Sequence, residues 1–172
     1  MNYMSIYKDD TANGEDYGTV LFVAGCDLYC ENGTCQNTEA YDFNGGKPFT
    51  REVMEEIFNE YIEKPYLGRL TISGGNPTSG CNPSALIPFL REFKEKFPHI
   101  KIWLYSGHTW EEIRMDLTCC SLIRFVDVLV DGRWVKALED PSAPYVGSNN
   151  QRLVDVKKSI KLGEVVLYEL YQ

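Results

Sequence analysis

Three of the six cysteines lie within one short stretch, at Cys26, Cys30 and Cys35. Glycine and polar residues separate them, and an apolar run, residues 20–23, comes directly before them. Three thiolates so close together suit zinc, or an iron–sulfur cluster that keeps one coordination position open. A disulfide would leave one thiol unpaired, and a chain of this size can build a core without one. We therefore predict a metal site in this stretch.

The ligand at the fourth coordination position distinguishes the two metals. Structural zinc normally has four protein ligands. His108 could complete such a set, but a histidine beside a glycine turn more often meets solvent or caps a helix. A [4Fe–4S] cluster held by three cysteines leaves one iron free for a small molecule. We favour the cluster, and zinc remains the alternative.

A glycine-rich segment, Gly74, Gly75, Asn76 and Pro77, follows the apolar run Leu70–Ser73. Such a segment often does no more than turn the chain tightly. After a buried strand, however, the missing side chains let a ligand approach the backbone N–H and C=O groups. Together with the cysteine loop, the segment is predicted to be a second part of a ligand site.

The elements that must position these segments alternate between strand and helix. Strands are predicted at Thr19–Ala24, Leu70–Ser73, Ile102–Tyr105 and Val126–Val130. Helices are predicted to begin near Thr50, at Asn82 as N-cap with Pro83 in the first turn, and at a capping box from Thr109 to Glu112. The first residues are polar and lead to a turn at Asn13-Gly14, and a hairpin over Leu162-Gly163 is expected near the end.

This alternation predicts right-handed βαβ units and a mainly parallel sheet in one α/β domain spanning residues 1–172. The chain is too short for eight β/α units, so we expect an incomplete, open barrel. Ligands bind at the carboxyl ends of the strands in such folds. The cysteine loop, the glycine-rich segment, Ser106-Gly107-His108 and Asp131-Gly132 each follow a predicted strand. We expect these four segments on one rim.

Charge and hydropathy narrow the class of partner and the compartment. The formal net charge of -8 argues against a nucleic-acid backbone or an anionic membrane as the main partner. No apolar run approaches the roughly 20 residues that span a bilayer. The first ten residues contain no signal-peptide core, so we expect a reducing cytoplasm.

Several other residues of reactive type have ordinary structural interpretations. Cys119 and Cys120 lie in an apolar helical context that favours buried structural thiols, and Cys81 is interpreted as structural or incidental. His108 and Trp110 are expected to shape a loop and helix cap.

Two features keep two interpretations each. Asp127 and Asp131 flank a strand end, where a carboxylate either binds a ribose hydroxyl or lies in a solvated turn. The irregular segment Glu139–Asn150 either helps to receive a polypeptide or is a surface loop.

The cysteine loop together with TISGGNP resembles radical S-adenosylmethionine enzymes. The wider pattern resembles the activating proteins of anaerobic ribonucleoside-triphosphate reductase. Supporting stretches cover most of the chain in the expected order: MNYMSIYKDDTANG, LFVAGC, FNGGKPFT, IWLYSGHTWEEI, VDVLVDGRWV and GSNNQRLVDVKKS. GSNNQR and VDVLVDG are the more discriminating.

The resemblance implies a ligand set for two cofactors. Cys26, Cys30 and Cys35 would hold a [4Fe–4S] cluster, whose open iron would bind S-adenosylmethionine. The cofactor-binding residues that it implies are Thr34, Gln36, Asn37, Gly74, Gly75, Asn76 and Pro77.

The resemblance also implies a reaction and partners. Reductive cleavage of S-adenosylmethionine to a 5′-deoxyadenosyl radical would create a glycyl radical on the large subunit of the reductase, with electrons from a small protein such as a flavodoxin. Two alternatives stay open: an activase for another glycyl-radical enzyme, such as a formate lyase or decarboxylase, and a non-catalytic, zinc-stabilised binding protein.

This sequence departs from the family pattern at several positions. The cysteines are separated by three and then four residues, whereas the family has three and then two. Gln36 replaces an aromatic residue, Val146 replaces an arginine, and Asn76 replaces an acidic residue. A neutral amide binds an ammonium group less strongly than a carboxylate does.

Overall fold

The computed structural model describes residues 1–30, 35 and 37–170, and these are built around a mixed β-sheet. The strands are β1 (Asn2–Asp10), β2 (Gly18–Val23), β3 (Lys47–Pro48), β4 (Arg69–Gly74), β5 (Lys101–Tyr105), β6 (Val128–Asp131) and β7 (Arg152–Asp155). The helices are α1 (Arg51–Glu63), α2 (Asn82–Lys96), α3 (Trp110–Arg114), α4 (Leu117–Ile123) and α5 (Val156–Leu162), with 3₁₀ turns η2 (Thr38–Ala40) and η3 (Lys136–Leu138). Within these ranges, no helix is long and apolar enough to cross a membrane.

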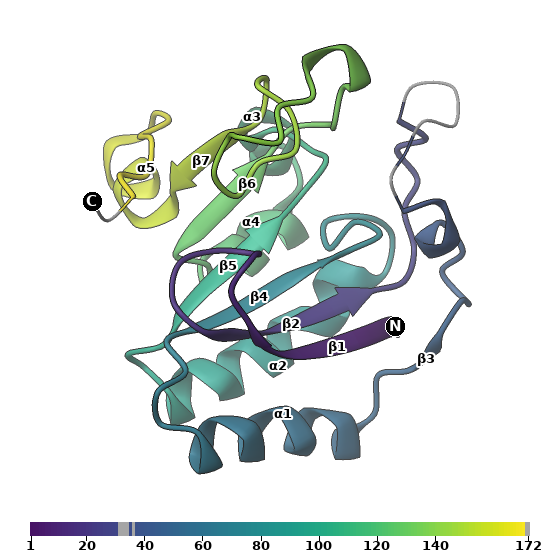
Figure 1. Ribbon diagram of the computed structural model, residues 1–172, viewed down its shortest axis with the longest axis vertical. Helices are drawn as coiled ribbons and strands as arrows, with labels where there is room; N and C mark the ends of the chain where they lie inside the picture. Colours follow the sequence, from purple (N-terminus) through teal and green to yellow (C-terminus); the bar gives the residue numbers. More distant parts are fainter. Residues whose placement is uncertain (31–34, 36, 171–172) are drawn as a thin grey trace.

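The strands lie in the order β3-β1-β2-β4-β5-β6-β7, which Figure 1 shows as one continuous twisted sheet. The four central strands are parallel, whereas β1, β3 and β7 are antiparallel to their neighbours. β3 and β7 are the two edges, so the sheet is open. The expected α/β class, the parallel centre and the open sheet are therefore confirmed, and all four expected strands are present to within two residues.

The N-terminal segment corrects the sequence-based expectation. Its polar composition predicted only an approach to a turn, but Asn2–Asp10 forms β1 and pairs along most of β2. Two register shifts interrupt this pairing, one between Tyr3 and Ser5 and one between Tyr7 and Asp10. The regular alternation that identifies a strand in sequence is therefore absent.

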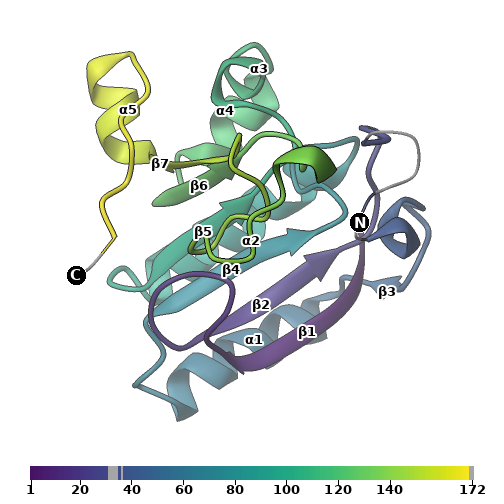
Figure 2. The same ribbon diagram turned by 45° about the horizontal axis from the view of Figure 1, so that its top comes forward.

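One face of the sheet is covered by α1 and α2, which lie side by side against it in Figure 2. Alternate residues of a strand point to opposite faces. On this side Leu70 and Ile72 of β4, and Ile102 and Leu104 of β5, pack against the helices. The helices contribute an aromatic cluster: Phe58, Tyr61, Phe89, Phe93 and Phe97. This cluster is the main core of the described residues.

The opposite face carries a smaller apolar cluster around Trp103, Val128 and Val130. Arg69 lies on this face and is fully buried. Its guanidinium group donates to the carbonyl oxygens of Asn13 and Glu15, both at 2.9 Å, and so fastens the loop that follows β1. Loops rather than long helices cover this face in the described part of the chain.

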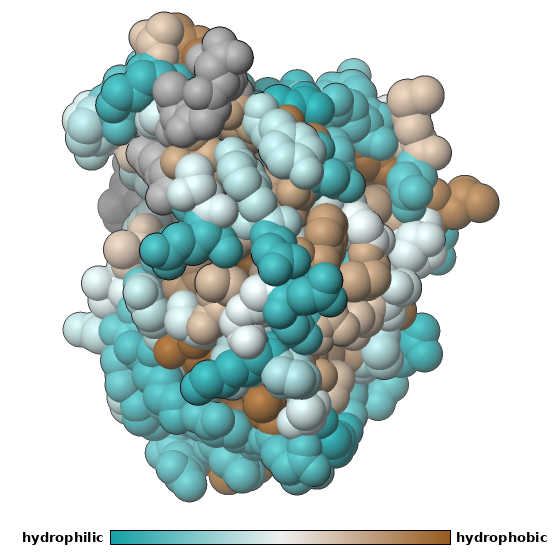
Figure 3. Space-filling model, turned by 90° about the vertical axis from the view of Figure 1, so that its right-hand side faces the viewer, coloured by the Kyte–Doolittle hydropathy of each residue, from teal (hydrophilic) through white to brown (hydrophobic). Residues whose placement is uncertain are grey.

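The side of the molecule at the β3–β1 edge has a mixed surface. Figure 3 shows polar and apolar residues interspersed there, with no single broad apolar patch among the residues that it colours.

The C-terminal segment also differs from the expectation. Leu162-Gly163 does not turn a hairpin but ends α5, where Gly163 has φ 77° in the left-handed conformation. Asp155 begins this helix, because its side chain accepts a hydrogen bond from the amide of Lys158 at 2.9 Å. The two expected hairpin segments do meet, through a bridge between Val154 and Leu167, but a helix joins them.

Candidate functional site

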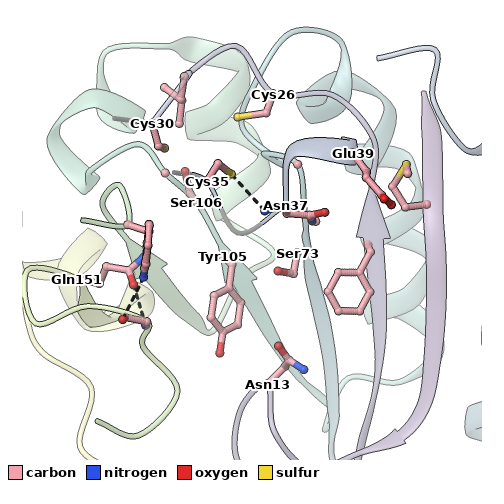
Figure 4. Close-up of a pocket in the computed structure, with 18 of the residues that line it drawn as sticks. Asn13, Cys26, Cys30, Cys35, Asn37, Glu39, Ser73, Tyr105, Ser106 and Gln151 are labelled. Atoms are coloured by element: carbon pink, nitrogen blue, oxygen red, sulfur yellow. Dashed lines mark hydrogen bonds between the residues drawn. The ribbon is translucent and has the colours of Figure 1, made fainter. Parts of the chain in front are cut away.

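A pocket of about 680 Å³ opens at the carboxyl ends of the parallel strands. All four segments expected on one rim contribute to it, together with β1 and the segment after β6. The residues that line it include Asn13, Cys26, Cys30, Cys35, Asn37, Gly74, Gly75, Tyr105, Ser106, Gly107, Gly132, Trp134, Gly147 and Gln151. Figure 4 shows the three cysteines at one end of this pocket and Asn13 at the other.

The three cysteines of the predicted metal site all line the pocket. Burial raises the pKa of the Cys26 thiol, and the neighbouring charges of Cys30, Asp27 and Cys35 act in the same direction. In the described residues, no three His, Cys, Asp or Glu side chains are arranged to hold a metal ion as they stand. The structure thus gathers the cysteines around one space without completing a coordination sphere.

The donor set fits an iron–sulfur cluster better than a four-ligand zinc site. His108, the candidate fourth zinc ligand, does not line this pocket. Its Nδ1 lies 2.8 Å from Thr78 Oγ1 and 3.2 Å from Asn76 Nδ2, so it belongs to the polar network beneath the glycine-rich segment. This agrees with the structural part expected for His108.

Gly74 and Gly75 line the pocket, but their lack of side chains serves the packing of the chain itself. A Cβ at Gly74 would lie 2.4 Å from the carbonyl oxygen of Val23, and one at Gly75 would lie 2.5 Å from that of Gly25. The amides of Gly75 and Asn76 donate to the same two carbonyl oxygens, each at 2.8 Å. The glycines therefore allow this segment to pack closely against the end of β2 and the start of the cysteine loop. This packing comes in addition to the part predicted from the sequence, which is to leave room for a ligand at the backbone.

Asn76 and Pro77 are not among the residues that line the pocket. The Asn76 side chain is fully buried, and its oxygen accepts a hydrogen bond from Thr78 Oγ1 at 3.0 Å. Its nitrogen donates to Ser79 Oγ at 2.7 Å. In this structure Asn76 thus supports the segment from beneath.

Asn82 supports the same segment and corrects its assignment as an N-cap. Cys81 occupies the cap position, and Asn82 is the first residue of α2. The side-chain nitrogen Nδ2 of Asn82 donates to the carbonyl oxygens of Ala24 at 2.9 Å and Asn76 at 3.1 Å. One side chain therefore joins the end of β2 to the glycine-rich segment.

The remaining predicted residues are distributed as follows. Asn37 lines the pocket and its amide donates to Cys35 Sγ at 3.4 Å, whereas Thr34 and Gln36 lie outside the described residues. Cys119 is buried as expected, whereas Cys120 is only half-buried, contrary to the expectation, and Cys81 is exposed.

Both aspartates considered for ribose binding are engaged in structural contacts. Asp131 is buried and accepts from the amide of Trp110 and from Arg152, each at 2.6 Å. Asp127 pairs with Lys94 at 2.7 Å, at the amino end of β6 and away from the rim. Neither lines the pocket.

Sequence reasoning did not single out Trp134, Tyr105 or Gln151 as parts of the site. Gln151 belongs to GSNNQR, which was singled out as a discriminating stretch but was given no structural part. Tyr105 reaches the pocket from the end of β5, and Trp134 and Gln151 reach it from the loop that follows β6.

Comparisons with known proteins support an iron–sulfur cluster in this chain. A family profile described as a 4Fe-4S single cluster domain matches residues 12–154. An anaerobic ribonucleoside-triphosphate reductase-activating protein from Pasteurella multocida is 32% identical over 152 residues, covering 88% of this chain and 95% of its own length. Proteins with the same name from Enterobacteria phage T4 (34% identical, 89% of this chain, 93% of its own) and from Escherichia coli K12 (30%, 88% and 96%) are also similar.

Proposed function

The chain belongs to the family of anaerobic ribonucleoside-triphosphate reductase-activating proteins, and from this we propose that it is a radical S-adenosylmethionine enzyme that creates a glycyl radical on such a reductase. One observation carries the proposal: Cys26, Cys30 and Cys35 share a single pocket with Gly74 and Gly75. A soft, cluster-type donor set thus adjoins a backbone segment suited to a small polar ligand. The open sheet then corresponds to an incomplete barrel of the radical S-adenosylmethionine type.

The three cysteines would hold a [4Fe–4S] cluster with one open iron. When bound, the cluster supplies one electron to the sulfonium of S-adenosylmethionine, so that the S–C5′ bond breaks to give methionine and a 5′-deoxyadenosyl radical. The chemistry so supplied would remove a hydrogen atom from the Cα of one glycine in the reductase and would leave 5′-deoxyadenosine as the product. The unpaired electron left on the glycine is stabilised by the flanking amides.

The residues of the chain bind and orient the reactants. Carbonyl oxygens of the glycine-rich segment are acceptors suited to the methionyl ammonium group. Asn37 adds a polar contact beside Cys35, and Thr34 and Gln36 are proposed to bind the cofactor from the same loop. Asn76 and Pro77 complete the segment, with the buried Asn76 side chain fixing its shape.

The proposed partners follow from the family. The main one is the large subunit of the reductase, which presents its glycine-bearing segment at the rim. A small electron-transfer protein, such as a flavodoxin, reduces the cluster, and the reaction takes place in the cytoplasm. The acidic balance of the chain supports a polypeptide rather than a nucleic acid as the docking partner.

The test is electron paramagnetic resonance of reduced, cluster-loaded protein mixed with S-adenosylmethionine and reductase without oxygen. We expect a glycine-centred doublet that disappears when the target glycine is replaced by alanine. Cys35→Ala should give no doublet, whereas Cys119→Ala should give one, because Cys119 is a buried thiol outside the pocket. Protein that cleaves S-adenosylmethionine but never forms the doublet would contradict the assignment to this reductase.

A further inference from the structure

The loop between β6 and β7, residues 132–151, is much longer than its hairpin requires. The strands that it joins are paired up to its ends, with Asp131 opposite Arg152. Besides η3, its regular structure is a bridge between Glu139 and Ser148. Four of its residues nevertheless line the pocket: Gly132, Trp134, Gly147 and Gln151. A long loop that reaches a site is held there by something other than strand pairing.

Gln151 provides the first set of these restraints. Its Oε1 accepts hydrogen bonds from the amides of Gly147 at 2.8 Å and Ser148 at 3.2 Å. Its Nε2 donates to the carbonyl oxygen of Gly132 at 2.9 Å. One side chain therefore joins the beginning of the loop to its returning arm.

The residues just before Gln151 provide a second set. Asn150 Nδ2 donates to the carbonyl oxygen of Arg133 at 2.8 Å, and Ser148 Oγ accepts from the amide of Val135 at 3.1 Å. The Ser148 hydroxyl also donates to Asn150 Oδ1 at 2.7 Å, and Ser148 is fully buried. Trp134 lies between these anchored residues, so its backbone is fixed on both sides.

The side chain of Trp134 is fixed by the same arm. Its indole N–H donates to the carbonyl oxygen of Gly147 at 3.2 Å, and a Cβ at Gly147 would approach the indole ring to 2.8 Å. Tyr105 of β5 donates from its hydroxyl to the carbonyl oxygen of Tyr145 at 2.9 Å, which ties the arm to the sheet. Gly147 is therefore required for the arm to pack on Trp134.

This wall offers the pocket bare backbone and the part of the Trp134 ring that the Lys136 ammonium, 5.6 Å from the ring centroid, does not cover. The indole N–H, both ends of the Gln151 amide and the Tyr105 hydroxyl all bond to the loop's own backbone. A nucleoside is usually selected by polar groups aimed at its edges. An aromatic face beside a glycine suits instead an extended polypeptide with small side chains, since aromatic anchors dominate such contacts.

We propose that Gln151 is a positioning residue that holds Trp134 and Gly147 as a docking wall for the polypeptide segment presented by the partner. This inference rests on the proposed function and adds to it the part of the pocket that receives the segment. Figure 4 shows Gln151 on the side of the pocket beyond Tyr105, apart from the cysteine end.

The experiment measures two dissociation constants for each cluster-loaded variant under anaerobic conditions, one for the reductase and one for S-adenosylmethionine. Trp134→Ala and Gln151→Ala should weaken reductase binding by about tenfold or more, and more than they weaken S-adenosylmethionine binding. Gln151→Glu should have an intermediate effect, because it keeps the acceptor for Gly147 and Ser148 but loses the donor to Gly132. Asn149→Ala, an exposed neighbour, is the matched control.

Hydrogen exchange gives a readout independent of binding. The amides of Gly147 and Ser148 should exchange faster in Gln151→Ala than in the wild type, while Trp134→Ala leaves the Gln151 bonds in place. Unchanged reductase affinity in both alanine variants overturns the proposal, as does a larger loss for S-adenosylmethionine than for the reductase. If the wild-type protein binds the reductase but forms no glycyl radical, the proposed function is wrong. The docking wall is then still tested by comparing the reductase affinities of the wild type and the two alanine variants.

Discussion

On one face of the sheet, α1 and α2 bury a continuous apolar cluster, whereas loops held by hydrogen bonds from polar side chains cover the other face. Apolar packing is tolerant of detail but adds much to stability. Hydrogen bonds to backbone groups add less stability each, but their preferred distances and angles fix the position of a loop. The pocket lies where the second kind of support prevails, because a site needs fixed geometry more than buried area.

The largest difference between the two faces of the sheet is expected when one aromatic ring is removed from each. Phe93→Ala, in the helix-covered cluster, should lower the free energy of unfolding by about 3–5 kcal/mol, because a fully buried ring leaves a cavity. Phe22→Ala, on the pocket side, should cost only about 1 kcal/mol, since Phe22 is partly exposed and packs on Tyr7. Denaturant unfolding of both variants measures the difference, and equal losses would contradict it.

Arg69→Lys tests the polar support directly. A lysine keeps the charge but cannot reproduce a fork that bonds to Asn13, Glu15 and Asp10, so we expect a loss of about 3 kcal/mol in the free energy of unfolding. Arg51→Lys is the matched control, because Arg51 is exposed and should tolerate the change. If Arg69→Lys unfolds at the same denaturant concentration as the wild type, the loop after β1 does not depend on this fork.

Asn76→Asp tests the support beneath the glycine-rich segment. The change removes the donor to Ser79 Oγ in a fully buried position, so stability should fall by about 2 kcal/mol. With the cluster intact, affinity for S-adenosylmethionine should stay the same, because the buried Asn76 side chain does not line the pocket. Calorimetric titration would refute the second expectation by showing weaker binding.

We expect the smallest effect from Asp127→Asn, which changes a carboxylate at the amino end of the parallel strands. Burial alone would raise the pKa of its carboxyl group, but hydrogen bonds from Lys157 and Lys94 outweigh burial and lower it. A lowered pKa in the folded state means that the stabilisation is present above the unfolded value and is lost as the pH falls. The free energy of unfolding should therefore fall more steeply for the wild type than for Asp127→Asn as the pH is lowered below about pH 4, which unfolding curves at several pH values would measure.

The sequence predicted correctly those parts of the fold that a short stretch of residues determines by itself. The capping box from Thr109 to Glu112 is present with both of its hydrogen bonds, and the four central strands were identified from short apolar runs. Because the carboxyl ends of parallel strands meet at one edge, the four rim segments could also be placed together. The sequence therefore located the pocket before any side chain was positioned.

The rest depends on contacts between distant residues. Asn82 has the pattern of an N-cap, yet its amide bonds to Ala24 and Asn76, a tertiary use that no local signal reveals. Gly163 has the signal of a turn, and the same left-handed conformation that would turn a hairpin ends α5 instead. Gln151 and the cysteines are more than one hundred residues apart in the sequence, and only the fold brings them to one pocket.

The most direct test of the account is metal and sulfide analysis of protein purified without oxygen. We predict about four iron and four sulfide per chain, bound through Cys26, Cys30 and Cys35. Replacing any of these three with alanine should abolish the cluster, whereas Cys119→Ala, whose thiol is buried outside the pocket, should retain it. Stoichiometric zinc without sulfide, or iron that survives the loss of Cys26, would contradict the claim that these three thiols form an iron–sulfur site.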